Sequence, residues 1–278
     1  MRTAFFVALI AATVPAAASA ATCEQSFAKR GSVLSGLNFT AQVDVADLTP
    51  ASAIGQMRGA AVAGKYDVIL EEADAGSLLI EQPAAGSARR IPIVVTATQT
   101  GSAGTVRMEV KMPAGMSAPA DGVRAEVCGM LSQLKGGRAG LAAAAQGMGA
   151  KSVSAPIRID AVTLSTQFAR ESLKNDAALP LRYKGKAFSV WGSVNHVMKD
   201  GEYFRVAFDT PEARDRAIRF DLPGDPAFMV NISCLMAKGQ NAYALTLKKG
   251  ALIRLTGTFF EYDTFKHTVW LNECRPSN

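Results

Sequence analysis

The chain has 278 residues, of which 49% are hydrophobic, and its formal net charge is +6. This length predicts two domains. Beyond the first residues there is no stretch of about 18 or more consecutive apolar residues, which excludes a transmembrane helix, and the modest charge lacks the dense basic stripe of a dedicated nucleic-acid-binding domain.

Residues 1–20 have the pattern of a secretory signal peptide. Arg2 supplies a positive start, residues 4–14 are apolar but too few to span a bilayer, and Ala18-Ser19-Ala20 matches an A-x-A cleavage site. We therefore expect cleavage near Ala20/Ala21 and a periplasmic or secreted mature protein. One alternative is a lipoprotein anchored through Cys23, although Thr22 is a poor residue to precede a lipidated cysteine.

The cysteines fit an oxidising compartment, where they pair as disulfides. Four cysteines allow three connectivities, and the spacing favours one bridge in each half of the chain, Cys23–Cys128 and Cys234–Cys274. By strict alternation Cys274 faces the same side as Trp270, so the second bridge requires a bulge or a strand end. A zinc site is excluded because the cysteines are far apart in sequence and the chain has only two histidines.

Residues 21–135 predict an α+β domain with the element order β-α-β-β-β-β-α. Thr49 and Pro50 suit the N-cap and first position of its first helix. This order favours an antiparallel sheet with two helices on one face. The predicted strands are residues 37–46, 66–72, 77–82, 90–99 and 105–112, and the predicted helices are residues 50–63 and 121–134.

Residues 136–155 differ in composition from both neighbours. They are mostly glycine, alanine and small polar residues with two cations and no acid. Such a segment is typical of a flexible interdomain linker. We predict a linker with at most one helical turn at residues 141–146.

Residues 156–278 predict an all-β domain that follows a helix at residues 162–176. Five short strands with period-two alternation come next, the first at residues 186–194 and the fourth at residues 249–259. Gly192 and Gly257 lie on the apolar faces of these two strands, where a missing side chain lets a sheet bend and close. The pattern therefore indicates a small five-stranded barrel.

The same region resembles a known family over about residues 160–275. It is similar to the exported bacterial OB-fold domains described as "tRNA-anticodon-binding-like", and the resemblance implies a five-stranded OB barrel. The residues that carry it are Lys174-Asn175-Asp176, Tyr183-Lys184-Gly185-Lys186, Val190-Trp191-Gly192-Ser193-Val194, Ile232-Ser233-Cys234, Lys249-Gly250, Leu255-Thr256-Gly257 and Leu271-Asn272-Glu273-Cys274. These motifs are mostly structural, and residues 21–135 resemble no family that we can name.

The resemblance implies where a ligand would bind. OB-folds bind on the exposed face of strands two and three and through two of their loops. A cation beside an aromatic ring suits stacking on a base or sugar and also suits a protein interface. The candidate ligand-binding residues are Trp191, Lys199, Tyr203, Arg205, Asn231, Tyr262, Phe265, Lys266 and Trp270.

Three functions compete. The chain has no nucleophile elbow, zinc helix, Walker loop or dinucleotide fingerprint, and its two histidines flank predicted turns. We therefore expect no catalytic residue, no metal and no cofactor. The favoured function is a non-enzymatic envelope protein that binds a protein or another envelope component. The alternatives are a binder of single-stranded nucleic acid or oligosaccharide, which the modest charge disfavours, and an enzyme with an interdomain site. The oligomeric state stays open.

Overall fold

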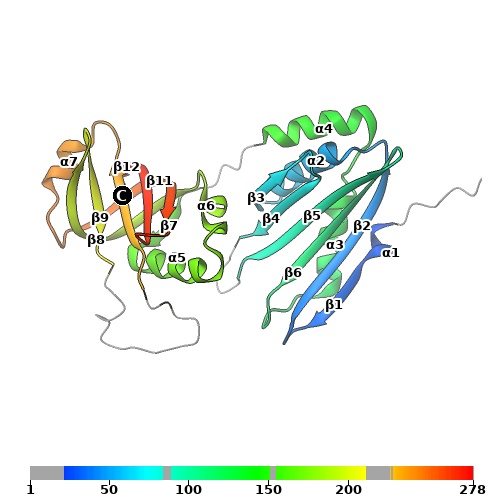
Figure 1. Ribbon diagram of the computed structural model, residues 1–278, viewed down its shortest axis with the longest axis horizontal. Coiled ribbons are helices and arrows are strands. Elements are labelled where there is room, and N and C mark those ends of the chain that lie inside the picture. Colours follow the sequence, from blue (N-terminus) through cyan, green and yellow to red (C-terminus); the bar gives the residue numbers. More distant parts are fainter. Residues whose placement is uncertain (1–21, 84–88, 151–154, 211–225, 227, 278) are drawn as a thin grey trace, which may run out of the picture. The chain divides into compact units, whose positions relative to one another are not determined.

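Two six-stranded sheets form the framework of the protein (Figure 1). The computed structural model describes residues 22–83, 89–150, 155–210, 226 and 228–277. The predicted signal peptide lies outside the described residues. The chain divides into two compact units, the first with Met1–Ala60, Ala73–Ser77 and Ile91–Met148, and the second with Ala61–Glu72, Leu78–Arg90 and Gly149–Asn278.

The first sheet has the strand order β1-β2-β6-β5-β4-β3. Along β6 the side chains alternate, with Val106, Met108 and Val110 buried and the residues between them more exposed. This alternation is what a strand shows when one face of its sheet is covered. The strands are β1 (Ala28–Ser32), β2 (Gly36–Ala46), β3 (Asp67–Glu72), β4 (Ser77–Gln82), β5 (Ile91–Thr100) and β6 (Ala103–Met112).

Four helices accompany this part of the described chain. They are α1 (Cys23–Ser26), α2 (Pro50–Ala63), α3 (Ala120–Leu131) and α4 (Gly137–Gly149). Figure 1 shows α4 running along α2. A Cβ on Gly59 would meet the backbone of Gly147 at 2.9 Å, and one on Gly55 would meet Ala144 at 3.0 Å, so the two helix backbones approach closely because these positions lack side chains.

The prediction for the glycine- and alanine-rich segment was wrong in its local structure. Instead of a flexible stretch with one helical turn, residues 137–149 form the whole of α4. Isolated glycines disfavour a helix, but the close packing against α2 compensates for that intrinsic cost. Arg58 adds a hydrogen bond to the carbonyl oxygen of Gly147.

The second sheet has the order β11-β12-β10-β9-β8-β7, and β11 also pairs with β8. This extra pairing closes β8, β9, β10, β12 and β11 into a ring. The strands are β7 (Ile157–Asp160), β8 (Ala187–Asp200), β9 (Tyr203–Phe208), β10 (Asn231–Met236), β11 (Leu252–Asp263) and β12 (Thr268–Pro276), and the helices are α5 (Ala161–Asn175), α6 (Ala178–Tyr183) and α7 (Asn241–Thr246). Asp160 caps α5, where its side chain accepts from the backbone N–H of Thr163.

The predicted fold class was wrong in both halves. The second sheet is not the all-β, five-stranded OB arrangement, because it has six strands, mixes antiparallel pairs with the parallel pairs β7–β8 and β10–β12, and carries three helices among its described residues. The first region has six strands and four helices, rather than five strands and two helices. The chain is a sheet-dominated protein built on two six-stranded sheets.

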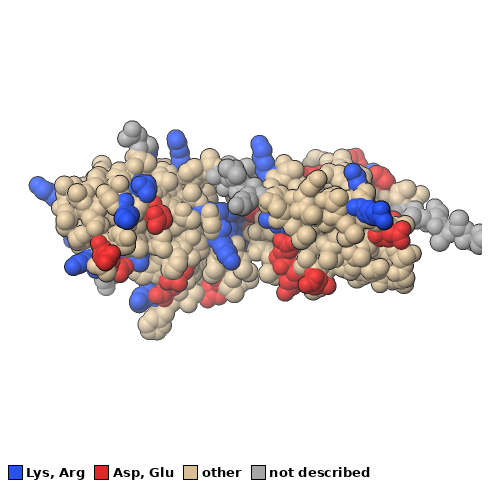
Figure 2. All heavy atoms as spheres, turned by 90° about the horizontal axis from the view of Figure 1, so that it is seen from above, with Lys and Arg blue, Asp and Glu red and all other residues tan. Residues whose placement is uncertain are grey.

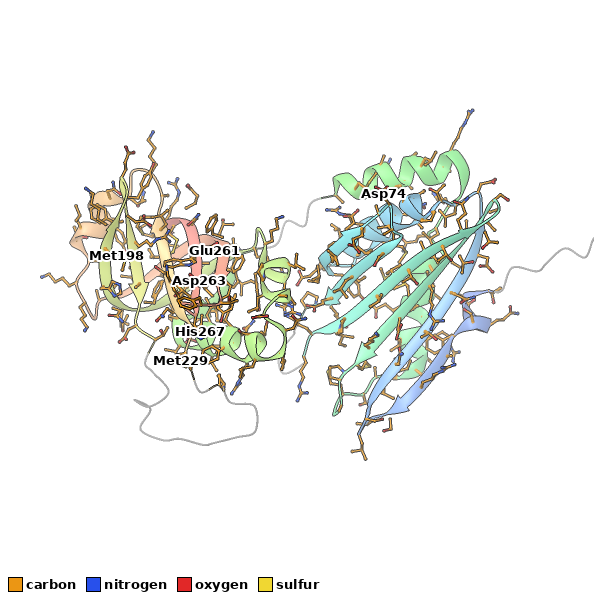
Figure 3. The ribbon with its side chains drawn as sticks, in the orientation of Figure 1. Asp74, Met198, Met229, Glu261, Asp263 and His267 are labelled. Atoms are coloured by element: carbon orange, nitrogen blue, oxygen red, sulfur yellow. A yellow bond between two sulfur atoms is a disulfide. The ribbon has the colours of Figure 1, made fainter. Side chains whose placement is uncertain are left out.

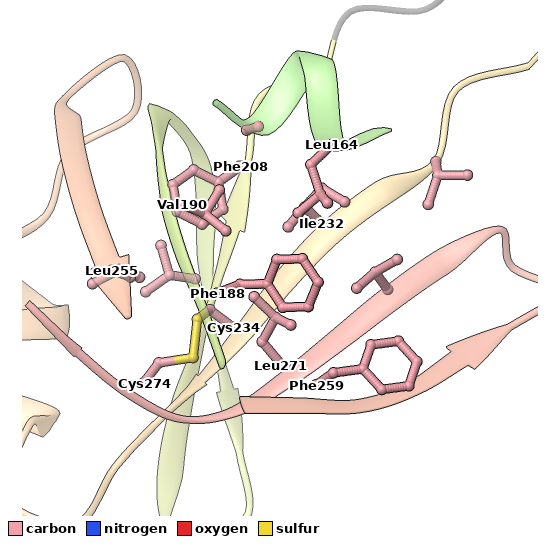
Figure 4. Packing of buried hydrophobic residues seen from close by; sticks show 14 of the residues in the cluster. Leu164, Phe188, Val190, Phe208, Ile232, Cys234, Leu255, Phe259, Leu271 and Cys274 are labelled. Atoms are coloured by element: carbon pink, nitrogen blue, oxygen red, sulfur yellow. A yellow bond between two sulfur atoms is a disulfide. The ribbon is translucent and has the colours of Figure 1, made fainter. Parts of the chain in front are cut away.

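The core of the second sheet consists mainly of apolar side chains and encloses a disulfide (Figure 4). Phe188, Ile232, Leu255 and Leu271 are at most 1% exposed. Burial of side chains of this size stabilises the fold by about 1.5–3 kcal/mol each. The second bridge, Cys234–Cys274, lies in this core.

A bulge resolves the parity conflict at Cys274. The β10–β12 register shifts between Cys234 and Met236, and Glu273 adopts a positive φ of 55°. The shift inserts one residue and returns Cys274 to the buried side. A Cβ on Gly257 would overlap the Sγ of Cys274, so this glycine makes room for the bridge.

The first predicted bridge is also confirmed, because Cys23 pairs with Cys128 and links α1 to α3. Both cysteines are 5% exposed. The Sγ atom of Cys23 is used in this bond, and a lipid anchor would need the same atom. In the bridged protein Cys23 therefore carries no lipid.

Candidate functional site

A cation stacked on an indole ring lies on the outer side of the second sheet. The core side of β9, β10 and β12 holds Val206, Cys234 and Leu271, so alternation places Arg205, Leu235 and Trp270 on the opposite side. The guanidinium carbon of Arg205 lies 4.5 Å from the centroid of the Trp270 ring. The structure thus brings together two of the residues that the sequence singled out.

Neighbouring residues extend this pair into a surface. Met198 on β8 pairs with Arg205, and Arg205 pairs with Leu235 on β10. Between the pairs Cys234–Leu271 and Met236–Cys274, the single residue Leu235 of β10 lies opposite the two residues Asn272 and Glu273 of β12. Met198, Arg205, Leu235, Trp270 and Asn272 are called the Arg205 face below.

Two polar atoms of the Arg205 face are buried without a hydrogen-bond partner, Nη1 of Arg205 and Oδ1 of Asn272. The Nε atom of Arg205 donates to Asp200 Oδ2, so one edge of the guanidinium is satisfied and the other is not. Nearly all buried polar atoms in native proteins have a partner, and exceptions call for an explanation such as an absent water or ligand. The Arg205 face therefore combines a stacked cation–aromatic pair with one buried donor and one buried acceptor that lack partners.

Three further predicted residues lie near the Arg205 face. Tyr203 begins β9, where it pairs with Asp200, and Lys199 pairs with Phe204 and is exposed. Asn231 is exposed at the start of β10. These polar groups border the face on the side of the β8–β9 turn and at the start of β10.

Trp191 lies apart from this pair. It is 39% exposed on β8, and Arg254 of the neighbouring β11 covers its ring at 5.5 Å. The second sheet thus has two tryptophans, each under its own arginine. Arg254 has no buried unpaired atom, which distinguishes it from Arg205.

Tyr262, one of the candidate ligand-binding residues, does not lie on an exposed loop. Tyr262 belongs to β11 and is 6% exposed, and its hydroxyl bonds to Ser172 Oγ at 3.2 Å. Burial raises the pKa of Tyr262. The cause is a register shift between Phe259 and Glu261, which turns Tyr262 inward.

Phe265 and Lys266 do occupy an exposed turn between β11 and β12. Phe265 is 93% exposed, and the backbone N–H groups of both residues donate to Asp263 Oδ1. Figure 3 labels Asp263 and His267, which flank this turn, well away from Met198. The structure therefore separates the turn from the Met198 end of the Arg205 face.

A second group of charged residues lies within the second unit and is buried. We call it the ionic cluster, and it consists of Asp67, Glu81, Arg90, Glu171, Arg182 and Lys186, whose side chains are 5–17% exposed. Arg182 donates from Nη2 and Nε to both oxygens of Glu81 at 2.6 and 2.8 Å. Lys186 Nζ and Arg90 Nη1 both contact Asp67 Oδ2, at 2.5 and 3.0 Å.

The ionic cluster surrounds the buried phenol of Tyr183. Its hydroxyl donates to Glu171 at 3.0 Å and accepts from Gln167 at 2.6 Å. Burial first, and then the carboxylate of Glu171, raise the pKa of Tyr183 well above its ordinary value. Burial lowers the pKa of Lys186, whereas the hydrogen bond with Glu81 is the largest cause of the raised pKa of Arg182.

The ionic cluster has the chemistry of a structural network. Its three carboxylates balance its three cations, and every member has an oppositely charged partner within 4.0 Å. Buried polar networks whose members are all paired rigidify the core around them. Sequence reasoning missed the cluster because its members are far apart along the chain. Glu81 and Arg182, for example, are separated by 101 positions.

Charges of both signs are mixed on the face that Figure 2 shows, where lysines and arginines are interspersed with acidic residues. Among the described residues, no group of His, Cys, Asp or Glu could hold a metal ion. Within the same part of the chain, no helix is long and apolar enough to cross a bilayer.

Comparisons with known proteins give no family. No family model and no curated protein matches the chain. One similar crystal structure is of a "putative nucleic acid-binding lipoprotein" from Klebsiella pneumoniae, with a TM-score of 0.32 and 16% identity over 44% of this chain and 92% of that one. Another is the di-domain ARO/CYC BexL of the BE-7585A biosynthetic pathway, with a TM-score of 0.22 and 11% identity over 80% of each chain. Likenesses at these TM-scores carry no argument about function, and the family resemblance seen in residues 160–275 stays a prediction.

Sequence reasoning also missed two residues near the tryptophans, Asn272 and Arg254. Asn272 lies two residues after Trp270, so period-two alternation already places both on one side of a strand. The contact of Arg254 with Trp191 could not be predicted in this way, because it depends on the register between β8 and β11.

Proposed function

We propose that this protein is an exported, non-enzymatic binding protein that uses the Arg205 face to hold a protein or another component of the cell envelope. The observation that carries the proposal is the stacked Arg205–Trp270 pair with a buried, unpaired Nη1 atom. Arginine and tryptophan are the residue types most enriched at the energetic centres of interfaces. The two disulfides support export, because such bonds persist in oxidising compartments.

Nucleic acid is the weaker candidate ligand. Acidic side chains border the Arg205 face, with Asp200 paired to Arg205 and Glu261 opposite Trp270. A polyanion would be repelled by these carboxylates, whereas binding of single strands normally depends on a positive groove. One face of the Trp270 ring is also already occupied by the guanidinium of Arg205.

Site-specific photo-crosslinking tests the proposal. A photoreactive amino acid at Met198, which is 45% exposed, samples the Arg205 face, and the same group at Leu34, which is 91% exposed, serves as a control far away in sequence. We expect discrete crosslinked species from Met198 in cells that export the protein, and none of them from Leu34. Identical products at both positions, or none at Met198, would overturn the proposal.

A further inference from the structure

A second patch on the outer side of the second sheet combines exposed apolar residues with cations. Along β8, β11 and β12 alternate residues pack into the core, among them Val190, Leu255 and Cys274, so the residues next to them face outward. Leu252 is 83% exposed and Trp191 is 39% exposed on this outer side. The residues of this patch, called the Leu252 face below, are Arg158, Trp191, Leu252, Arg254 and Arg275.

The strand register gathers two arginines of the Leu252 face into one row. Arg158 of β7 lies opposite Ser189 of β8, and Ser189 lies opposite Thr256 of β11. Thr256 lies in turn opposite Arg275 of β12, so the row crosses four strands. Neighbouring strands are about 4.8 Å apart, so the row spans at most about 14 Å along the backbones.

The third arginine lies beside the two apolar residues. Arg254 is opposite Trp191, and its guanidinium carbon is 5.5 Å from the centroid of the ring. Leu252 precedes Arg254 by two positions and therefore faces the same side. Leu252 is diagonal to Trp191 across the β8–β11 pair, and diagonal residues are about 7–8 Å apart. The apolar side chains and the arginine are thus neighbours.

The cations of the Leu252 face are not neutralised by ion pairs. Within the described part of the chain, no hydrogen bond or ion pair involves the guanidinium of Arg158, Arg254 or Arg275. Lys248 and Lys249 are exposed just before β11 and add two charges near Leu252.

Carboxylates near the Leu252 face are fewer than its cations. Asp160 lies opposite Trp191 and caps α5, Asp209 follows β9, and Glu273 lies in the bulge of β12. These three acidic residues meet the three arginines and two lysines, which leaves the surface with a positive balance.

An anionic lipid bilayer suits both kinds of side chain. Tryptophan is enriched at membrane–water interfaces, where its ring lies at the level of the headgroups, and an exposed leucine gains from apolar surroundings. Cations are attracted to anionic headgroups. A single-stranded nucleic acid offers phosphates and stacking bases, but no apolar phase that would cover Leu252.

We infer that the Leu252 face docks on the surface of an anionic phospholipid bilayer. Leu252 and Trp191 enter the headgroup region, and the three arginines contact lipid phosphates. This contact needs no lipid on Cys23, whose Sγ atom is bonded to Cys128. The inference goes beyond the proposed function, because it concerns a surface other than the Arg205 face.

Vesicle sedimentation with the full-length mature protein tests the inference. We expect binding to phosphatidylglycerol vesicles that weakens with salt, and weaker binding to phosphatidylcholine vesicles. Each cation near an anionic surface strengthens binding about fivefold, so Arg158→Gln/Arg254→Gln/Arg275→Gln should bind phosphatidylglycerol about a hundredfold more weakly. The matched control, Lys65→Gln/Lys174→Gln/Lys184→Gln, removes three exposed cations elsewhere and should bind nearly like the wild type.

The apolar part of the contact has its own matched pair of variants. Leu252→Ser should weaken binding about tenfold, whereas Leu34→Ser, at a position that is 91% exposed outside the Leu252 face, should not. The chain has two tryptophans, so Trp270→Phe leaves Trp191 as the reporter. Its emission should shift to the blue on phosphatidylglycerol vesicles.

The outcomes are distinguishable from those of the proposed function. Thermal melts monitored by circular dichroism first establish that each variant is folded. Absence of vesicle binding, equal binding of the two triple variants, or an unchanged Trp191 emission would overturn the inference. Oligothymidylate binding that depends on the three arginines, without vesicle binding, would also overturn it and assign the face to nucleic acid. Crosslinking at Met198 reports on the Arg205 face alone, so either proposal can fail while the other stands.

Discussion

Arg182 in the ionic cluster and Arg205 on the Arg205 face are buried to the same extent, with 16% of each side chain exposed. Their surroundings differ. Arg182 makes a bidentate pair with Glu81 and a further contact with Glu171, whereas Arg205 has one carboxylate partner and an unpaired Nη1 atom. Equal burial therefore accompanies different degrees of pairing, since every nitrogen of the Arg182 guanidinium has a carboxylate partner and that of Arg205 at Nη1 has none.

The largest expected effect comes from removing a partner inside the ionic cluster. Glu81→Ala leaves the Arg182 guanidinium buried without its bidentate acceptor, and breaking a buried ion pair typically costs about 3–5 kcal/mol. We expect the free energy of unfolding, measured by urea titration at neutral pH, to fall by about that amount.

The matched control is Asp121→Ala. Asp121 also pairs with an arginine, Arg124, at 3.2 Å, but its side chain is 90% exposed. Exposed ion pairs contribute little to stability, so this variant should unfold like the wild type. Equal effects of the two variants would show that burial of the ionic cluster does not matter.

The second-largest effect is expected at alkaline pH, where the phenol of Tyr183 inside the ionic cluster should make the free energy of unfolding fall. Burial and the Glu171 carboxylate raise the pKa of Tyr183 in the folded state. Below about pH 10 the phenol is protonated in both states, and above it only the unfolded chain ionises, so stability falls by about 1.4 kcal/mol for each pH unit. Urea titrations between pH 9.5 and 11.5 should show a shallower fall for Tyr183→Phe, and identical slopes would contradict this explanation.

Removing a polar group from the Arg205 face should not lower the stability of the protein, in contrast to the changes in the ionic cluster. Asn272 Oδ1 is buried and unpaired, and a buried polar group without a partner costs about 1–3 kcal/mol. Asn272→Leu removes this group at similar volume, so we expect the free energy of unfolding to stay unchanged or to rise by about 1 kcal/mol. A loss of more than about 1 kcal/mol would indicate that Asn272 has a structural partner.

Features set by local or pairwise constraints could be predicted from the sequence, whereas features set by packing between distant segments could not. Both disulfides followed from spacing, and the bulge at Glu273 followed from the parity of Cys274, because both are local or pairwise constraints. The helix α4 could not be predicted from local sequence. Its small residues are compatible with a helix because α4 packs closely against α2 at Gly55 and Gly59. The ionic cluster was invisible because its members are distant in sequence, and Tyr262 was misplaced because one register shift reverses which side a residue faces.

The smallest effect distinguishes the two arginine–tryptophan pairs. Cation–π contacts are worth about 0.5–1 kcal/mol at exposed sites and about 2 kcal/mol when desolvated. Arg205 lies 4.5 Å from the Trp270 ring, whereas Arg254 lies 5.5 Å from the ring of Trp191, which is 39% exposed. Double-mutant cycles on unfolding, with arginine changed to methionine and tryptophan to leucine, should therefore give a larger coupling energy for Arg205–Trp270. Equal couplings would mean that the two pairs differ only in the unpaired Nη1 atom, and the case for the Arg205 face would then rest on that atom and Asn272 alone.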